Sequence, residues 1–101
     1  MHFRIAKAWL TRNLRDALRN CGYFGIQDRQ SGRVSYVRRL SKSQHYPRFH
    51  LYLEELSQGY NFSLHLDQKK ESYQGTRAHS ADYDEPEVKA EASRIKESIK
   101  Y

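Results

Sequence analysis

The 101-residue chain contains little of what several classes of protein require. Its one cysteine, Cys21, excludes both a disulfide framework and any zinc module built on cysteine ligands. No apolar run approaches the ~20 residues that cross a bilayer as a helix, and no apolar segment near the start precedes a small-residue cleavage site of the secretory type. These absences predict a cytoplasmic protein without a membrane partner.

Aliphatic side chains are scarce as well. Leu, Ile, Val and Phe together supply 20 residues, which is near the ~20% level below which chains tend toward disorder. The core must therefore be small, and some of the eight tyrosines are expected to complete it. Because a length near 100 residues is typical of one domain, we expect residues 1–101 to form a single domain.

Positive charge is what the chain has in excess, and the excess is uneven. The net charge is +6, but residues 1–50 hold eleven Lys and Arg against two acidic residues, and residues 51–101 hold seven against ten. A basic surface attracts phosphate-bearing partners, although a merely solvated surface has the same composition. The arginines that would contact phosphate and the tyrosines that would stack on bases are Arg12, Arg15, Arg19, Arg38, Arg39, Arg48, Tyr36 and Tyr52.

Hydrophobic periodicity predicts a helix near each end of the chain. Apolar residues spaced three and four apart predict a helix over 3–21, although Phe3 and Ile5 also alternate with polar neighbours as in a short strand. A narrow apolar stripe, with Pro86 suited to the first position and acidic residues in the first turn, predicts a helix over 85–101.

Two hairpins are predicted between these helices. The turn residues Ser31-Gly32 predict one hairpin over 23–40, and strict alternation of apolar and polar residues predicts another over 48–69. Residues 69–84 show no periodicity and are expected to form a long loop. The fold expected from this order is α+β: a four-stranded antiparallel sheet with the N- and C-terminal helices packed on one face.

The sheet face left open by the helices, here called the outer face, is predicted to carry polar and titratable side chains. A turn centred on Gln58-Gly59 closes the hairpin over 48–69 with its apolar residues on the other face. Directly opposed residues place their Cβ atoms ~4.5–5.5 Å apart. With that turn, the opposed pairs on the outer face are His50 with Asp67, Tyr52 with His65, and Glu54 with Ser63.

Imidazoles and carboxylates on one small surface are typical of acid–base or metal chemistry. A mixed nitrogen and oxygen ligand set suits Zn²⁺ or Mn²⁺ better than Mg²⁺, and it would consist of His50, His65, His79 and Asp67. With Glu54 as general base and with Asp67 and Lys69 as further catalytic groups, the chain would be a small metal-dependent hydrolase or phosphoesterase. Metal-free catalysis by the His50–Asp67 pair and an ordinary polar face are the alternatives.

Several short segments resemble a group of short bacterial hypothetical proteins. The segments are Tyr46–Tyr52, Leu64–Lys69, Ser72-Tyr73, Gly75 and Ala78–Ser80. The likeness extends over about residues 12 to 95, although the group has Gly where this chain has Ala81. The resemblance implies a bacterial setting and a loop over 69–84 that belongs to the domain. The group has no assigned activity, so the resemblance implies no reaction, cofactor or partner.

Three functions fit these observations. The charge asymmetry favours a nucleic-acid or phosphate-ligand binding module. The histidines and carboxylates of the outer face indicate the metal-dependent hydrolase as an alternative, so whether the chain is an enzyme stays open. A homodimeric protein-interaction subunit that buries the outer face against a second copy is the third function.

Overall fold

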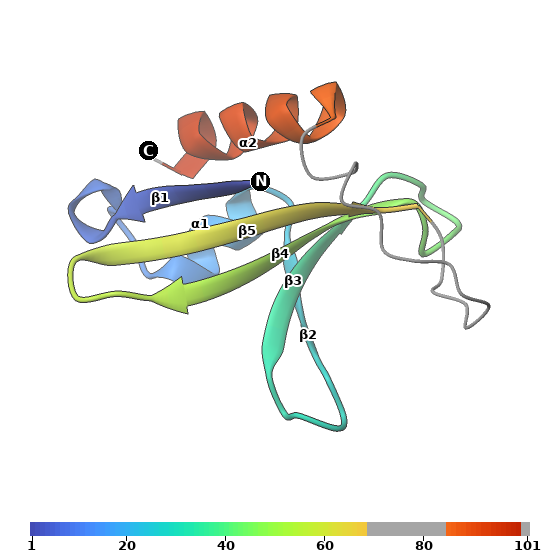
Figure 1. Cartoon of the computed structure of the whole chain (residues 1–101), viewed down its shortest axis with the longest axis horizontal. Coiled ribbons are helices and arrows are strands. Elements are labelled where there is room, and N and C mark those ends of the chain that lie inside the picture. Colours follow the sequence, from blue (N-terminus) through green and yellow to red (C-terminus); the bar gives the residue numbers. More distant parts are fainter. Residues whose placement is uncertain (69–84, 100–101) are drawn as a thin grey trace.

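The computed structural model describes residues 1–68 and 85–99 and has an α+β fold with one antiparallel sheet (Figure 1). The sheet contains five strands in the order β1-β5-β4-β3-β2, which is one strand more than predicted. In chain order, the elements are β1 (His2–Ala6), the 3-10 helix η1 (Lys7–Trp9), α1 (Leu14–Asn20), β2 (Phe24–Gln27), β3 (Val34–Arg39), β4 (Arg48–Glu55), β5 (Gly59–Asp67) and α2 (Pro86–Ile99).

The additional strand lies at the N-terminus, so the helix predicted over 3–21 is wrong in its first half. Phe3 and Ile5 are buried whereas His2 and Arg4 are exposed, which is the period-two pattern of a strand with one buried face. β1 pairs antiparallel with β5 at the edge of the sheet, with Phe3 and Ile5 on the buried face. Over residues 2–6, the alternation of apolar and polar residues therefore predicts the observed strand, whereas the spacing of apolar residues by three and four predicted a helix.

Both α-helices begin at residues whose chemistry suits that position. The side chain of Asn13, the N-cap of α1, accepts a hydrogen bond from the backbone N–H of Asp16 at 2.9 Å. After α1 the chain turns at Gly22, whose φ of 95° favours glycine. Pro86 is the first residue of α2, as predicted, because its missing N–H would have no partner there in any helix.

The two predicted hairpins are present, but neither has the predicted register. A two-residue turn at Ser31-Gly32 would place Ile26 opposite Val37, whereas Ile26 lies opposite Ser35. β4 pairs with β5 so that Leu51 lies opposite Leu64 and not opposite Leu66. The turn explains the difference: the backbone N–H of Leu56 donates to the carbonyl of Gly59 at 2.8 Å, which closes the hairpin one residue earlier than predicted. Because the partners move by an even number of residues, every side chain keeps its predicted face.

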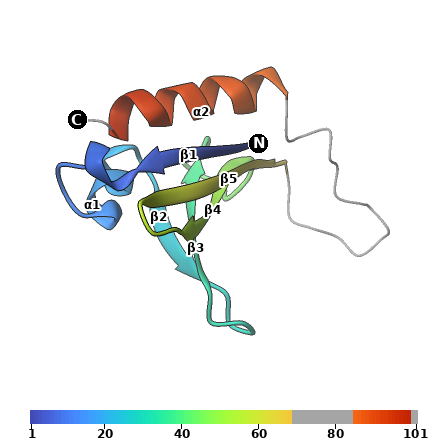
Figure 2. The same cartoon turned by 60° about the vertical axis from the view of Figure 1, so that its left-hand side comes forward.

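One buried cluster joins a single face of the sheet to both α-helices. α2 runs alongside β1 and β5 in both views of the fold (Figures 1 and 2). The cluster consists of Phe3, Ile5, Ala17, Leu18, Cys21, Tyr23, Phe49, Leu51, Phe62, Leu64, Leu66, Val88, Ala92, Ile95 and Ile99. As expected from the scarcity of aliphatic residues, tyrosines contribute: Tyr23 is fully buried, and Tyr36 and Tyr60 pack against the cluster.

The β2–β3 hairpin departs from the rest of the sheet. Pairing of β3 with β4 ends where Tyr36 lies opposite Leu51, and beyond this point the hairpin projects away from β4 (Figures 1 and 2). All four residues of β2 are exposed. The hairpin therefore adds little to the core and instead forms one wall of a surface depression described below.

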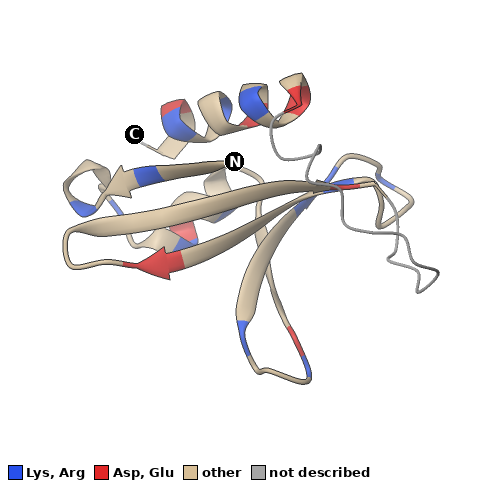
Figure 3. Cartoon of the chain, in the orientation of Figure 1, with Lys and Arg blue, Asp and Glu red and all other residues tan. Residues whose placement is uncertain are grey.

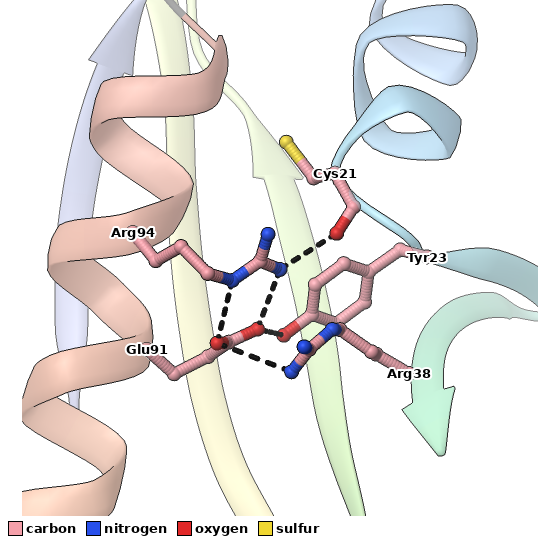
Figure 4. Close-up of polar contacts among 5 residues, drawn as sticks. All are labelled: Cys21, Tyr23, Arg38, Glu91 and Arg94. Carbon is pink, nitrogen blue, oxygen red and sulfur yellow. Dashed lines mark hydrogen bonds and ion pairs between the residues drawn. The ribbon is translucent and has the colours of Figure 1, made fainter. Parts of the chain in front are cut away.

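A buried polar network fastens α2 to the rest of the chain (Figure 4). Glu91, 5% exposed, accepts a hydrogen bond from the Tyr23 hydroxyl at 2.6 Å and from Nε and Nη2 of Arg94 at 2.8 and 2.9 Å. Arg38 lies 3.4 Å from the same carboxylate, and Arg94 also donates to the carbonyl of Cys21 at 2.6 Å. Burial, and then the adjacent Glu91 carboxylate, raise the pKa of the Tyr23 phenol above its usual range. We call these residues the Glu91 network.

Candidate functional site

The outer face gathers titratable and aromatic side chains from all five strands. The strand registers place His50 directly opposite His65, and Arg39 opposite Arg48, which in turn lies opposite Asp67. Successive side chains along a strand point to opposite faces of the sheet, so the registers decide which residues share the outer face. Its residues are His2 and Arg4 of β1, Phe24 and Ile26 of β2, Ser35, Val37 and Arg39 of β3, Arg48, His50, Tyr52 and Glu54 of β4, and Asn61, Ser63, His65 and Asp67 of β5.

His50 is the centre of a hydrogen-bonded array on this face. Its Nδ1 lies 3.0 Å from Oδ2 of Asp67, and its Nε2 lies 2.8 Å from Oγ of Ser35. An ionised carboxylate can only accept, so whenever the ring is neutral its Nδ1 carries the proton and its Nε2 can accept the hydrogen bond of the Ser35 hydroxyl. His50 is only 8% exposed, and its apolar neighbour Val37 on β3 is 7% exposed. We call these three residues the Ser35–His50–Asp67 array.

Arg48 completes the surroundings of Asp67. Its Nε donates to Oδ2 of Asp67 at 3.2 Å, and its guanidinium lies 4.5 Å from the centroid of the Tyr46 ring. Burial is the largest single influence on the pKa of Asp67 and favours the neutral carboxyl. The hydrogen bonds and charges of His50 and Arg48 together outweigh burial, so the pKa of Asp67 falls below its usual range. The carboxylate of the array is therefore ionised at neutral pH.

Aromatic contacts hold the middle of the outer face together. The ring of Tyr52 stacks on that of His50 with 4.4 Å between centroids, and it meets His65 edge-on at 5.4 Å. Burial, followed by the positive charge of the terminal amino group, lowers the pKa of His65 below its usual value. A second serine–histidine contact lies nearby, with Oγ of Ser63 2.9 Å from Nδ1 of His2.

A depression opens beside the array, where the β2–β3 hairpin diverges from β4. Its volume is about 680 Å³. Ser35 and His50 lie at its border, so the array is accessible from it. The lining residues are Ile26, Gln27, Asp28, Ser31, Arg33, Val34, Ser35, His50, Tyr52 and Leu53.

The predicted catalytic and metal-binding residues are only partly brought together. His50 and His65 share the outer face with Asp67, but no group of three or more His, Cys, Asp or Glu side chains suited to a metal ion occurs within residues 1–68 and 85–99. His79 and Lys69 lie outside the described residues. Glu54 is exposed and lies opposite Asn61, apart from the Ser35–His50–Asp67 array.

The predicted phosphate-binding and stacking residues do not form one surface. Arg12, Arg15 and Arg19 lie exposed in α1 or just before it. Arg38 and Tyr36 belong to the face of β3 that points to the core, where Arg38 contacts Glu91. Only Arg39, Arg48 and Tyr52 lie on the outer face. Figure 3 likewise shows Lys and Arg spread over several elements.

Sequence reasoning missed two residues of this face, Ser35 and Phe24. Phe24 is 59% exposed, the highest value among the exposed large hydrophobic residues of the described part of the chain. Ser35 gives no local signal, because its partner His50 comes from a strand on the far side of a long connection. Its contact with His50 could be predicted only from the correct pairing of β3 with β4.

Comparisons of the chain with protein-family models, with curated proteins and with solved structures found no match. In the part of the chain that the structure describes, no helix has the length and apolar character needed to cross a membrane. The function is therefore argued from the residues of the outer face.

Proposed function

We propose that the outer face is a binding surface for single-stranded nucleic acid. The observation that carries this proposal is the presence of two exposed aromatic rings on one sheet face: Phe24 is 59% exposed and Tyr52 is 46% exposed. Aromatic rings on an open sheet can stack with unpaired bases, and each such contact contributes ~1–3 kcal/mol. A duplex hides its base faces, so this chemistry selects single strands.

A pair of arginines on the same face supplies contacts to phosphate. Arg39 and Arg48 lie directly opposite each other on β3 and β4, and like charges in this position destabilise a sheet. Asp67 balances Arg48, but among the described residues no carboxylate forms an ion pair with Arg39. A phosphate bound between the two guanidinium groups would relieve the repulsion and accept hydrogen bonds from both.

Fluorescence anisotropy with a labelled single-stranded RNA of about 12 nucleotides tests the proposal. The matched duplex is the competing ligand, and both are titrated between about 50 and about 200 mM salt. Phe24→Ala should weaken single-strand binding about 5- to 100-fold because it removes one stacking partner. Leu40→Ala, a change at another exposed apolar residue, should leave the affinity within about twofold of the wild-type value.

Arginine variants distinguish the outer face from the competing surface on α1. Arg39→Gln should reduce the slope of log K against log salt by ~0.7, the contribution of one phosphate contact to a single strand, whereas Arg15→Gln should leave it unchanged. Binding that is absent at low salt, indifferent to salt or lost only on Arg15→Gln would overturn the proposal. So would a native mass of two chains that Phe24→Ala reduces to one, because the face would then serve self-association.

A further inference from the structure

The Ser35–His50–Asp67 array has the order of contacts that activates a serine hydroxyl as a nucleophile. Asp67 holds Nδ1 of His50 at 3.0 Å, and Nε2 of the same ring lies 2.8 Å from the Ser35 hydroxyl. A carboxylate on one ring nitrogen fixes the tautomer in which the other nitrogen can accept a proton. Geometry and roles, not position in the sequence, define such an arrangement.

The surroundings hold this array in place. The Tyr52 ring stacks on His50 with an angle of 25° between the ring planes, which limits rotation of the imidazole. Only 8% of His50 is exposed, so neighbouring side chains restrict the ring as well. Ser35 lies just past the end of the β3–β4 pairing and borders the 680 Å³ depression, so a substrate can reach its hydroxyl.

We infer that Ser35 is an acyl-accepting nucleophile for small carboxylic esters bound in the depression. Ser35 Oγ attacks the carbonyl carbon while its proton passes to Nε2 of His50, and Asp67 stabilises the resulting imidazolium. The ester C–O bond then breaks, and His50 returns the proton to the departing alkoxide. Water, deprotonated by the same nitrogen, releases the carboxylic acid and restores the Ser35 hydroxyl. The net reaction consumes one ester and one water and yields one acid and one alcohol.

The lining of the depression indicates the size and polarity of the acyl group. Ile26, Val34 and Leu53 contribute aliphatic side chains to the lining, and a volume of about 680 Å³ suits a small ligand. A short aliphatic acyl group therefore fits better than a charged one. This inference can fail separately from nucleic-acid binding, because it depends on Ser35 and the depression and not on Phe24 or Arg39, although Tyr52 belongs to both sites.

The chain contains its own comparison for this chemistry. Ser63 also contacts a histidine, with its Oγ 2.9 Å from Nδ1 of His2. Within the described residues, however, His2 has no carboxylate partner, and its contact with Ser63 is exposed. A hydroxyl beside an exposed and unassisted imidazole should react far more slowly than Ser35. Ser63 is thus a matched internal control.

Covalent labelling of the intact chain with a fluorophosphonate, followed by peptide mass spectrometry, tests the inference. The adduct is expected on Ser35, and Ser63→Ala should label at the wild-type rate. Ser35→Ala should lose the adduct, and His50→Gln should slow labelling by about 100-fold or more. Asp67→Asn keeps a polar partner for Nδ1 but favours the wrong tautomer, so it should slow labelling in the same way while circular dichroism shows an intact fold.

Hydrolysis of p-nitrophenyl butyrate provides the second readout. The rate should fall with labelling in the Ser35→Ala variant and stay unchanged in Leu40→Ala, a change at an exposed residue outside both proposed sites. An adduct on Ser63, labelling of Ser35 that is indifferent to Asp67→Asn in a folded protein, or no adduct at all would overturn the inference. The site of the adduct is read from the wild-type chain, so the result stands even if His50→Gln fails to fold.

Discussion

Tyr23→Phe should destabilise the fold by an amount that the Glu91 network allows to be worked out. The Tyr23 hydroxyl is buried and donates to a charged acceptor, Glu91, at 2.6 Å. A hydrogen bond to a charged group contributes ~1.5–3 kcal/mol. The carboxylate keeps the two N–H donors of Arg94 in the variant, so no further group loses its partner. The expected loss in the free energy of unfolding is therefore about 2 kcal/mol.

Urea denaturation followed by circular dichroism measures this loss. With a slope of ~2 kcal/mol/M for a chain of this size, the midpoint should fall by about 1 M. Tyr60→Phe is the matched control, because the Tyr60 hydroxyl forms no hydrogen bond to a described residue. Glu91→Ala should lower the free energy of unfolding by more, ~3–5 kcal/mol, because it removes the carboxylate that both the Tyr23 phenol and Arg94 contact. If Tyr23→Phe matched Tyr60→Phe, or if Glu91→Ala cost less than Tyr23→Phe, the reasoning would be refuted.

Three other features lead to measurable outcomes. Gly59→Ala should destabilise the fold by more than ~2 kcal/mol, measured by urea titration, because a Cβ would lie 2.6 Å from the carbonyl oxygen of Ile5; a smaller effect would show that β1 moves easily. Acidification from pH 7 to 5 should lower the urea midpoint, because the folded-state pKa of His65 lies below the usual 6.5 and the unfolded chain then binds more protons; Asp67, whose pKa is also lowered, extends the loss below about pH 4. Cys21 is 2% exposed and burial raises its thiol pKa, so a disulfide reagent should react with it only after unfolding; prompt reaction in native buffer would contradict its placement.

Side-chain faces in β4 and β5 could be predicted from the sequence, whereas strand partners could not. Alternation fixes which residues point to the core, and a displacement of two residues leaves that pattern intact. The choice between the two registers depends on the position of the turn. Gly59 was interpreted as a turn residue, which placed the turn one residue too late. Its role is to admit the backbone of Ile5, since any larger residue would collide with that carbonyl. Because the segment containing Ile5 was predicted as a helix, the contact between Ile5 and Gly59 could not be predicted.

The residues that give the outer face and the core their chemistry meet over long sequence separations. Tyr23 and Glu91 are 68 positions apart, and Arg94 and the Cys21 carbonyl are 73 apart. Hydrophobic periodicity describes neighbours along one element, so it contains no information about such meetings. Glu91 even falls on the buried side of α2, where a pattern of apolar residues predicts none. His50 and Asp67 do meet, because both lie on the two strands whose faces were predicted correctly, but they are diagonal neighbours and not the directly opposed pair that was predicted.

The position of β1 has a consequence for how the chain acquires its fold. β1 is made before every other strand, yet among the described residues it pairs with β5 alone, the last strand of the sheet. The hairpins formed by the four later strands close locally and quickly, whereas β1 must wait until the whole sheet has left the ribosome. Phe3 and Ile5 remain exposed during that time, and closing so long a segment costs chain entropy. We therefore expect the docking of β1, together with the packing of α2 over the core, to be a late event in folding.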